Sequence, residues 1–209
     1  MAYSEKQVQI METAETLFAE KGFNGTSVRD IAEKAHVNLA MVSYYFGSKD
    51  KLLEALFSYR GEHLKLKLES MIDNKELSAS QKMDTLIDHF IDKATKQQCF
   101  SRIMAREQVV NHTGITAQLI FQMKKQNQEL ISKLIHQGQR KGEFKKNIDI
   151  PLMMATLVGT TNTIVATQYY YRQINNLQSL TEEEFQKHIK KKLSQHLKKL
   201  FKAILTNEE

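Results

Sequence analysis

Residues 26–49 read TSVRDIAEKAHVNLAMVSYYFGSK. The first part of this stretch carries apolar residues at positions 28, 31, 32 and 35, which is the spacing of a helix that buries one face. The pattern breaks at His36 and Val37, and Asn38 can then cap a second short helix. The inward positions of that helix hold Leu39, Val42, Tyr45 and Phe46. Two short amphipathic helices joined by a tight turn predict a helix-turn-helix.

A longer helix precedes this pair. Residues 5–21 have four apolar residues on one face, and Gly22 is suited to end the helix because glycine readily adopts left-handed backbone. Small Ala32 lets the two short helices cross closely, which leaves the outer face of the second one free for the major groove of DNA. The pattern alone is also compatible with three helices that form a purely structural bundle. The four apolar residues of the first helix are Ile10, Ala14, Leu17 and Phe18.

A dense set of residues in and around the helix pair carries a family resemblance: Phe18, Gly22, Phe23, Thr26, Ser27, Val28, Arg29, Asp30, Ile31, Ala32, Val37, Tyr44, Tyr45, Phe46, Ser48, Lys49, Leu52 and Leu53. Over about residues 8–55 the chain resembles the N-terminal domain of the TetR family of transcriptional regulators. The resemblance implies a homodimeric, all-α, ligand-responsive DNA-binding protein, most often a repressor.

The sequence departs from the family pattern at two places. His36 stands in the turn where the family usually has glycine, and histidine tolerates left-handed backbone better than most residues. The second helix is uncharged, because no residue from Ala35 to Ser48 is Asp, Glu, Lys or Arg. It therefore has no arginine for the two-hydrogen-bond contact with guanine.

Candidate DNA contacts lie on and beside the second helix. The resemblance implies a DNA contact for Tyr44 and a phosphate contact for Tyr45, although Tyr45 can instead be partly buried. Asn38 either reaches a base edge or only caps its helix, and Arg29 either contacts DNA or is a solvated surface side chain. The predicted DNA-binding set is Thr26, Ser27, Arg29, Asn38, Ala40, Met41, Tyr44, Tyr45 and Lys49.

Some of these assignments rest on simple chemistry. Lys49 is placed at a helix start, where the helix dipole disfavours a cation but favours an anion such as phosphate. Thr26 and Ser27 carry hydroxyl groups that can donate to phosphate. Ala40 and Met41 face outward on the predicted helix and can touch thymine methyl groups.

The rest of the 209-residue chain shows helical periodicity almost throughout. No stretch alternates like a strand, so the predicted fold class is all-α. An N-terminal three-helix helix-turn-helix DNA-binding domain over residues 4–64 is fused to a C-terminal helical ligand-binding and dimerisation bundle over residues 65–209. Helices are predicted near residues 49–68, 79–97, 99–110, 115–140, 151–174 and 181–205.

The last two helices are predicted to form a homodimer interface. Small residues along helix 151–174 let a partner helix approach closely, and the final helix has one apolar stripe. The resemblance implies that the same two helices pair as a four-helix bundle, whereas packing within one chain is the alternative. The predicted interface residues are Ala155, Gly159, Thr163, Ala166, Ile189, Leu193, Leu197 and Leu200.

A pocket for an unidentified small-molecule effector is predicted in the C-terminal bundle, where the resemblance implies one. Methionine and aromatic side chains adapt to ligands, but each of them is more often plain core. Asn162 adds a polar group that either binds a ligand or joins two helices. The predicted pocket residues are Met83, Phe90, Phe100, Met104, Phe121, Met154, Asn162 and Tyr169.

The positive net charge suggests a polyanionic partner, but most of this charge lies outside the predicted DNA-binding domain. The chain has a formal net charge of +6 and a pI near 9.2, which suggests a polyanionic partner. However, residues 1–50 contain five basic and seven acidic side chains, whereas residues 185–205 contain seven lysines and no acidic residue. The alternative function is therefore a basic protein that binds a membrane surface or a partner through this last helix.

Other classes of protein are disfavoured. The single cysteine, Cys99, excludes an intramolecular disulfide. Neither a signal peptide nor a membrane-spanning run is apparent. We therefore expect a cytoplasmic bacterial protein that joins the nucleoid when it binds DNA. The segment Glu33–His36 has one E-x-x-H motif, whereas a di-iron bundle needs two. No catalytic residue, metal site or cofactor is predicted, and a small helical enzyme is the least favoured alternative.

Overall fold

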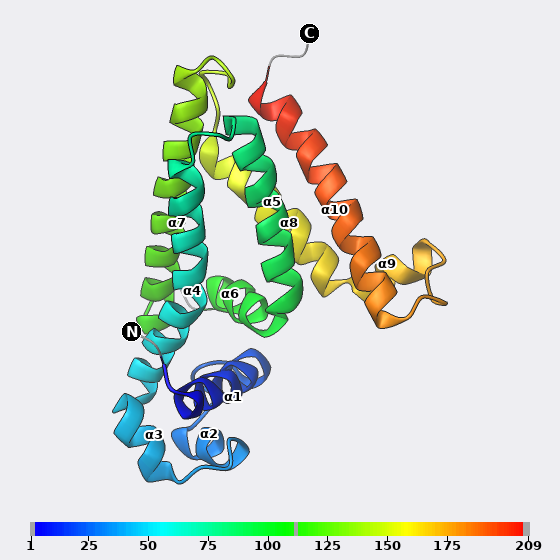
Figure 1. The fold of residues 1–209 in the computed structure, drawn as a ribbon. Coiled ribbons are helices and arrows are strands. Elements are labelled where there is room, and N and C mark those ends of the chain that lie inside the picture. The colour runs from blue at the N-terminus through cyan, green and yellow to red at the C-terminus, as the bar shows by residue number, and fades with distance from the viewer. Residues whose placement is uncertain (1–2, 111–112, 207–209) are drawn as a thin grey trace. The chain divides into compact units, whose positions relative to one another are not determined.

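The computed structural model describes residues 3–110 and 113–206, and every regular element within these ranges is a helix (Figure 1). The predicted all-α fold class is confirmed. In chain order the helices are α1 (Glu5–Lys21), α2 (Val28–Lys34), α3 (Leu39–Phe46), α4 (Lys49–Asp73), α5 (Ala79–Lys96), α6 (Gln98–Val110), α7 (Ile115–Arg140), α8 (Ile150–Ala166), α9 (Gln168–Ile174) and α10 (Glu182–Leu205).

The helices group into two compact units. The first comprises Met1–Leu66 with Cys99–Lys125, and the second comprises Lys67–Gln98 with Gln126–Glu209. α6 and the first part of α7 thus pack with the N-terminal helices, although the sequence had assigned them to a C-terminal domain over residues 65–209. The N-terminal unit is therefore larger than the helix-turn-helix itself.

Local caps explain where the first helices begin and end. Ser4 and Gln7 form a capping box at the start of α1, and Ser27 and Asp30 form another at the start of α2. Each box gives a side-chain oxygen to a backbone N–H that has no partner inside its helix. Gly22 ends α1 as predicted, with a φ of 79°.

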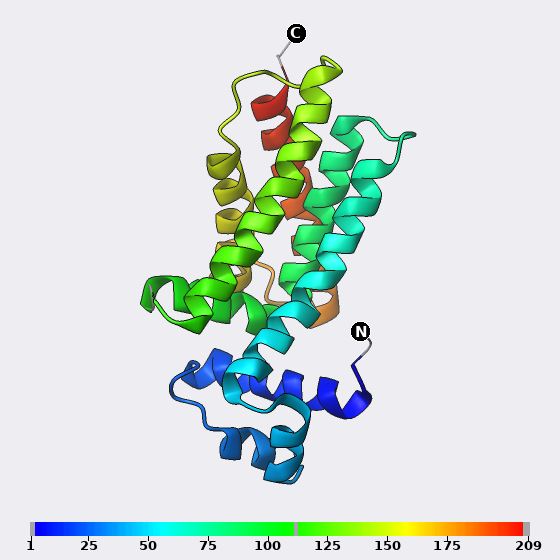
Figure 2. The same cartoon turned by 90° about the vertical axis from the view of Figure 1, so that its left-hand side faces the viewer.

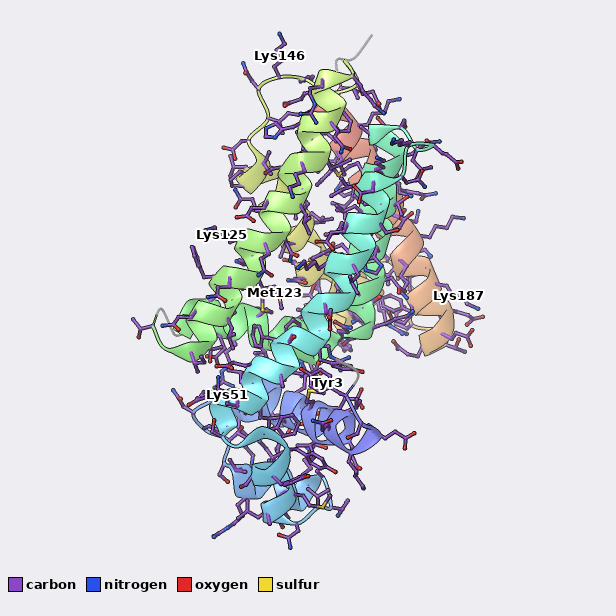
Figure 3. All side chains as sticks on the ribbon, turned by 60° about the vertical axis from the view of Figure 1, so that its left-hand side comes forward. Tyr3, Lys51, Met123, Lys125, Lys146 and Lys187 are labelled. Atoms are coloured by element: carbon purple, nitrogen blue, oxygen red, sulfur yellow. The ribbon has the colours of Figure 1, made fainter. Side chains whose placement is uncertain are left out.

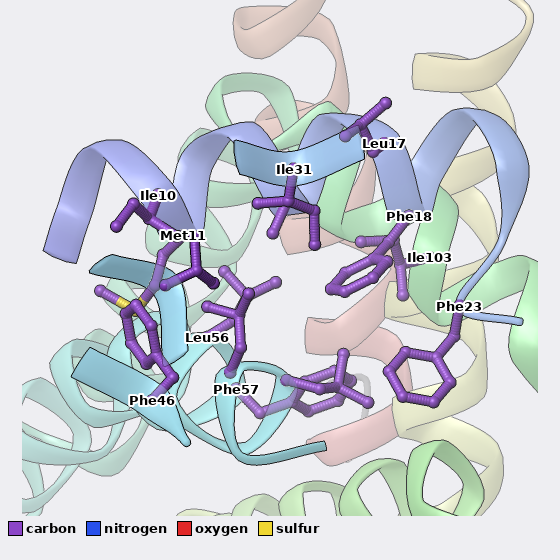
Figure 4. Close-up of a cluster of buried hydrophobic side chains, with 14 of the residues drawn as sticks. Ile10, Met11, Leu17, Phe18, Phe23, Ile31, Phe46, Leu56, Phe57 and Ile103 are labelled. Carbon is purple, nitrogen blue, oxygen red and sulfur yellow. The ribbon is translucent and has the colours of Figure 1, made fainter. Parts of the chain in front are cut away.

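The core of the first unit lies between α1, α2, α3, α4 and α6, and Figure 4 shows its central side chains. The four inward positions predicted for the first helix are all buried. An edge-to-face contact between the rings of Phe57 and Phe100, with centroids 5.1 Å apart, joins α4 to α6. The buried set includes Ile10, Met11, Ala14, Leu17, Phe18, Ile31, Ala32, Val42, Phe46, Leu52, Leu53, Leu56, Phe57, Phe100 and Ile103.

One ion pair reinforces this core. Glu15 on α1 is only 3% exposed, and its Oε2 atom accepts hydrogen bonds from Nε and Nη2 of Arg60 at 2.9 and 2.6 Å. A buried carboxylate that lost this partner would be left without its counter-charge, so the pair fixes α1 against α4.

In the second unit, α5, α8 and α10 contact one another (Figures 1 and 2). Two aspartates of α5 hold the charged side of α10. Asp92 accepts from Nζ of Lys190 at 2.7 Å, and Asp88 accepts from Nζ of Lys198 at 2.5 Å. The pKa of Asp92 is lowered overall, because the hydrogen bonds from Lys190 and Lys96 outweigh the opposing effect of partial desolvation.

Two predicted helix boundaries were wrong. α4 continues to Asp73 instead of ending near residue 68. The helix predicted over residues 151–174 is broken at Thr167 into α8 and α9, which are bent by 77°. The hydroxyl of Thr167 donates to the carbonyl oxygen of Thr163 at 2.7 Å, and Nε2 of Gln168 donates to that of Val165, so side chains take carbonyl groups at the end of α8.

No single helix in the described ranges is long and apolar enough to cross a membrane. Only α8 and α9 taken together meet the length and composition criteria, and they are the sharply bent pair.

The turn between α2 and α3 generates a first prediction. His36 has a φ of 50°, as its position in place of glycine suggested, and its side chain is exposed. Left-handed backbone strains a residue with a Cβ atom but not glycine. We therefore expect His36→Gly to keep or raise the free energy of unfolding, by up to about 1 kcal/mol, in thermal or urea melts.

The matched control is Glu33→Gly, because Glu33 is exposed within the ordinary helix α2. There glycine should cost about 1 kcal/mol. A clear loss of stability for His36→Gly would contradict the backbone explanation and would assign needed contacts to the imidazole.

Candidate functional site

The outward face of α3 is exposed. Val42 and Phe46 face the core, whereas Ala40, Ser43 and Tyr44 are exposed. The Tyr44 side chain is 84% exposed, which is the largest value among the exposed large apolar side chains of the described residues. A helix anchored on one face and bare on the other is the arrangement that a groove-binding helix needs.

Leu39 belongs to this exposed face, which corrects the sequence prediction. The periodicity placed it inward with Val42, but its side chain is 42% exposed. Leu39 is the first residue of α3, where the helix has only begun to pack on the core. Leu39 and Ser43 are thus two surface residues that the predicted DNA-binding set missed, and their i, i+4 spacing was the available signal.

Two of the predicted DNA contacts serve as helix caps. Oδ1 of Asn38 accepts from the backbone N–H of Ala40 at 2.9 Å, and Oγ of Ser27 accepts from that of Asp30 at 3.1 Å. Their capping role is therefore real. The amide NH2 of Asn38 lies on an exposed residue and can still donate outward, whereas the hydroxyl hydrogen of Ser27 faces the Asp30 carboxyl group.

Met41 and Tyr45 are half-buried. The Tyr45 ring lies between its neighbours, with centroids 5.3 Å from Tyr44 and 6.4 Å from Phe46. The alternative of partial burial thus holds for Tyr45, and its phenol hydroxyl is the part of the side chain suited to a polar contact.

Thr26 is not a side-chain donor to phosphate. It is 2% exposed, and its hydroxyl donates to the carbonyl oxygens of Gly22 at 2.9 Å and Leu17 at 3.3 Å. A threonine hydroxyl has only one hydrogen to donate, and here it points to the end of α1. Thr26 therefore shapes the loop instead of facing DNA.

Lys49 has a structural role that the sequence argument missed. Its ammonium donates to the carbonyl oxygens of Phe23 and Thr26, both at 2.9 Å, and lies 4.3 Å from the centroid of the Phe23 ring. These contacts tie the loop after α1 to the first residue of α4. Two of three ammonium hydrogens are used in this way, which leaves one for an anion.

Cationic groups flank α3 without lying on it. Arg29 is exposed on α2, and Lys51 on α4 is exposed and extends from its helix in Figure 3. The pKa of Asp30, beside Arg29, is lowered because its carboxyl group accepts hydrogen bonds from the backbone N–H and then the hydroxyl of Ser27. The exposed face of α3 is therefore neutral, with charge only at its margins.

A side chain from far along the sequence holds the end of α1. Nη1 and Nη2 of Arg106 on α6 donate to the carbonyl oxygens of Glu20 and Lys21 at 3.3 and 3.5 Å. A Cβ atom on Gly22 would lie 3.1 Å from this guanidinium group. No sequence signal connects residues so far apart, so this contact was not predicted.

The predicted pocket residues divide between the two units. Phe100 and Met104 pack in the core of the first unit, and Phe121 of the same unit is 66% exposed. Tyr169 on α9 is 77% exposed. Periodicity marks such residues as apolar but cannot say which unit receives them.

The remaining predicted pocket residues, Met83, Phe90, Met154 and Asn162, belong to the second unit. Met83 is buried in the core, whereas Phe90 and Met154 are half-buried. On α8, Oγ1 of Thr161 and Oδ1 of Asn162 are buried without a hydrogen-bond partner among the described residues. Within the described part of the chain, no group of three His, Cys, Asp or Glu side chains is placed to hold a metal ion.

The predicted dimer residues separate into two groups. Ile189, Leu193 and Leu197 are buried within the protomer, where α10 packs on α5 and α8, so their side chains are not available to a second copy. Leu200 is half-buried. The stripe of small residues on α8 is exposed: Ala155, Gly159, Thr163 and Ala166.

Comparisons with known proteins agree with this architecture. A family model described as "Bacterial regulatory proteins, tetR family" matches residues 10–56. A second model, described as "Tetracyclin repressor-like, C-terminal domain", matches residues 80–195. Together the two models span the helix-turn-helix and most of the remaining helices.

Named relatives and solved structures are of the same kind. The HTH-type transcriptional repressor NicS of Pseudomonas putida is 30% identical over 159 residues, which are 71% of each chain. The probable HTH-type transcriptional regulator YttP of Bacillus subtilis is 31% identical over 137 residues, or 65% of this chain and 66% of that one. The structure of the ketosteroid transcriptional regulator KstR2 of Mycobacterium tuberculosis has a TM-score of 0.72 at 20% identity and covers 99% of this chain and 98% of that one. The structure of FadR of Bacillus subtilis in complex with stearoyl-CoA has a TM-score of 0.66 at 20% identity, with 91% and 96% covered.

The contacts of Lys49 generate a second prediction. Lys49→Met keeps the aliphatic stem but removes two charge-assisted hydrogen bonds, so it should lower the free energy of unfolding by about 1.5–3 kcal/mol in urea melts. Lys51→Met is the matched control, because Lys51 is 65% exposed and forms a surface ion pair with the nearby Glu54. That variant should stay within about 0.5 kcal/mol of the parent. Equal stability of the two variants would show that Lys49 does not hold the loop.

Proposed function

Because this chain belongs to the tetR family of bacterial regulatory proteins, we propose that it is a homodimeric repressor that binds palindromic operator DNA through α3. A small-molecule effector bound by the C-terminal bundle releases it from the operator. The chain is a helix-turn-helix transcriptional regulator like its named relatives, and the dimer, the operator and the effector are the proposed parts.

The observation that carries the DNA-binding proposal is the bare outer face of α3. Ala40, Ser43 and Tyr44 are exposed there, while Val42 and Phe46 anchor the helix from behind. The second helix of a helix-turn-helix lies in the major groove, and groups around it contact the phosphates. Arg29, Ser27, Tyr45 and the remaining ammonium hydrogen of Lys49 are the phosphate contacts that we assign.

The dimer proposal rests on α8. Besides its exposed small residues, α8 carries Leu152 with its side chain 66% exposed, so one whole face of an apolar helix is uncovered. Such a face on a globular protein marks an interaction surface. Small side chains there let the same helix of a second copy approach closely, and half-buried Leu200 on α10 contributes at the margin.

The effector proposal rests on α8 as well, but on its inner side. The buried, unpartnered oxygens of Thr161 and Asn162 have lost water without gaining a hydrogen bond, which costs free energy unless a ligand supplies one. Met83, Phe90 and Met154 are the apolar residues that we assign to the pocket. Long-chain acyl-CoA compounds are the first to test, because a structural neighbour is described in complex with stearoyl-CoA.

DNA selection tests the operator. The purified protein, incubated with a random double-stranded pool, should enrich a palindrome, because two copies present two α3 helices related by two-fold symmetry. Tyr44→Ala should then weaken binding of that DNA by about ten-fold or more while the melting temperature stays unchanged, since the side chain is 84% exposed.

Tyr170→Ala is the control for this variant, because Tyr170 on α9 is also exposed but belongs to none of the assigned sites. It should bind the operator like the parent protein. Unchanged affinity of Tyr44→Ala in gel-shift titrations would remove Tyr44 from the DNA-binding surface.

Light scattering tests the dimer. The parent protein should have about twice the monomer mass of 24.2 kDa. Gly159→Lys should produce monomers, because a Cβ atom at Gly159 meets nothing within 4 Å in the protomer but a lysine would place like charges across the interface. Gln128→Lys, at an exposed position of α7, should leave the dimer intact. A dimeric Gly159→Lys variant would refute this choice of interface.

A further inference from the structure

We propose that α3 reads its operator half-site through the methyl groups of thymine, with Leu39 and Ala40 as the contacting side chains, and not through hydrogen bonds to base edges. This inference rests on the proposed DNA-binding function and names the bases that the site selects.

The hydrogen-bonding groups available on α3 are poor at telling bases apart. Arginine, lysine, asparagine, glutamine and the acidic residues make the discriminating major-groove contacts, and of these the segment 35–48 contains only Asn38. A bidentate contact with adenine needs the amide oxygen and the amide nitrogen together. The oxygen of Asn38 already accepts from Ala40 N–H, so one of its two lone pairs and the direction of the side chain are committed to capping the helix.

The hydroxyl groups on the same face do not replace Asn38. Ser43 and Tyr44 are exposed, and each carries one hydroxyl group. A hydroxyl both donates and accepts, so it fits more than one base and carries little sequence information. Hydrogen bonding from α3 therefore positions the helix without specifying its target.

Apolar surface is what α3 does present. Leu39 is the first residue of the helix and is 42% exposed, and the N-terminal residues of a recognition helix are those that meet base edges. Ala40 beside it is small and exposed, which allows close approach. The thymine methyl is the one apolar group on the major-groove edges of the four bases, so it is the group that this surface complements.

The charge balance points the same way. Residues 1–50 carry five basic and seven acidic side chains, so the DNA-reading part of the chain lacks a strong general attraction for phosphate. Lys49 uses two of its three donors within the protein. Attraction to phosphate adds affinity without discriminating between sequences, so the discrimination is assigned to the apolar contacts of α3.

Deoxyuridine substitution tests the proposal directly. It removes only the methyl group of thymine and keeps the base pair. In the operator selected by the parent protein, replacing each thymine in turn should identify one or two positions per half-site where affinity falls by about four-fold, as expected for one buried methyl group. Replacement in both half-sites should multiply the two losses.

A double-mutant cycle assigns the contact to Leu39. In Leu39→Ala, loss of the methyl at the sensitive position should change affinity by less than about 1.5-fold, because the partner surface is already gone. Leu66→Ala is the matched control, since Leu66 is a 58% exposed leucine on α4 away from α3, and it should keep the full penalty. Circular dichroism melts confirm that each variant is folded.

The outcomes separate the two proposals. A selected operator that tolerates deoxyuridine at every position overturns the methyl readout while the DNA-binding function stands. A half-site specified by G·C pairs overturns it as well. Failure of the folded protein to enrich any DNA overturns the proposed function and this inference with it.

Discussion

A helix of eight residues is too short to hold itself in water, and the DNA-reading surface of this protein depends on overcoming that limit. α3 is held in place because Val42 and Phe46 are buried in the same core as residues of α1 and α4. That core in turn requires α1 to stay where it is, and the buried pair of Glu15 with Arg60 secures it. With one face fixed in this way, the opposite face of α3 is left wholly available.

The polar groups around α3 illustrate how few side chains remain for a ligand once the fold has used the others. Thr26, Asn38 and Lys49 have the chemistry of DNA contacts, yet each is hydrogen-bonded within the protein: Thr26 and Lys49 donate to backbone carbonyl groups, and Asn38 accepts from a backbone N–H. Thr26 is fully used, whereas Asn38 and Lys49 keep donors in reserve. The backbone of a tight turn has carbonyl and N–H groups that lack a hydrogen-bond partner within a helix. Nearby polar side chains supply these partners.

The apolar stripe of α10 and the small-residue stripe of α8 differ in whether the protomer covers them. The stripe of α10 is covered by α5 and α8 of the same chain, and two aspartates of α5 neutralise lysines that flank it. The small-residue stripe of α8 stays uncovered. Lysines such as Lys187, which extends from α10 in Figure 3, therefore lie on the exposed side of a packed helix. Their number alone does not indicate that the protein binds nucleic acid.

The sequence by itself determined the helices, their caps and the helix-turn-helix, because these depend on residues within a few positions of one another. Asn38 and Gly22 cap the helices where their residue types predict, and the sequence alone shows that α3 carries no charge. Only the tertiary structure decided that α6 belongs with the N-terminal helices, that Lys49 reaches back to the loop at Phe23, and that Leu193 is covered by its own chain. Periodicity says that a face is apolar, but what covers that face is a matter of long-range packing, which spacing along the chain does not encode.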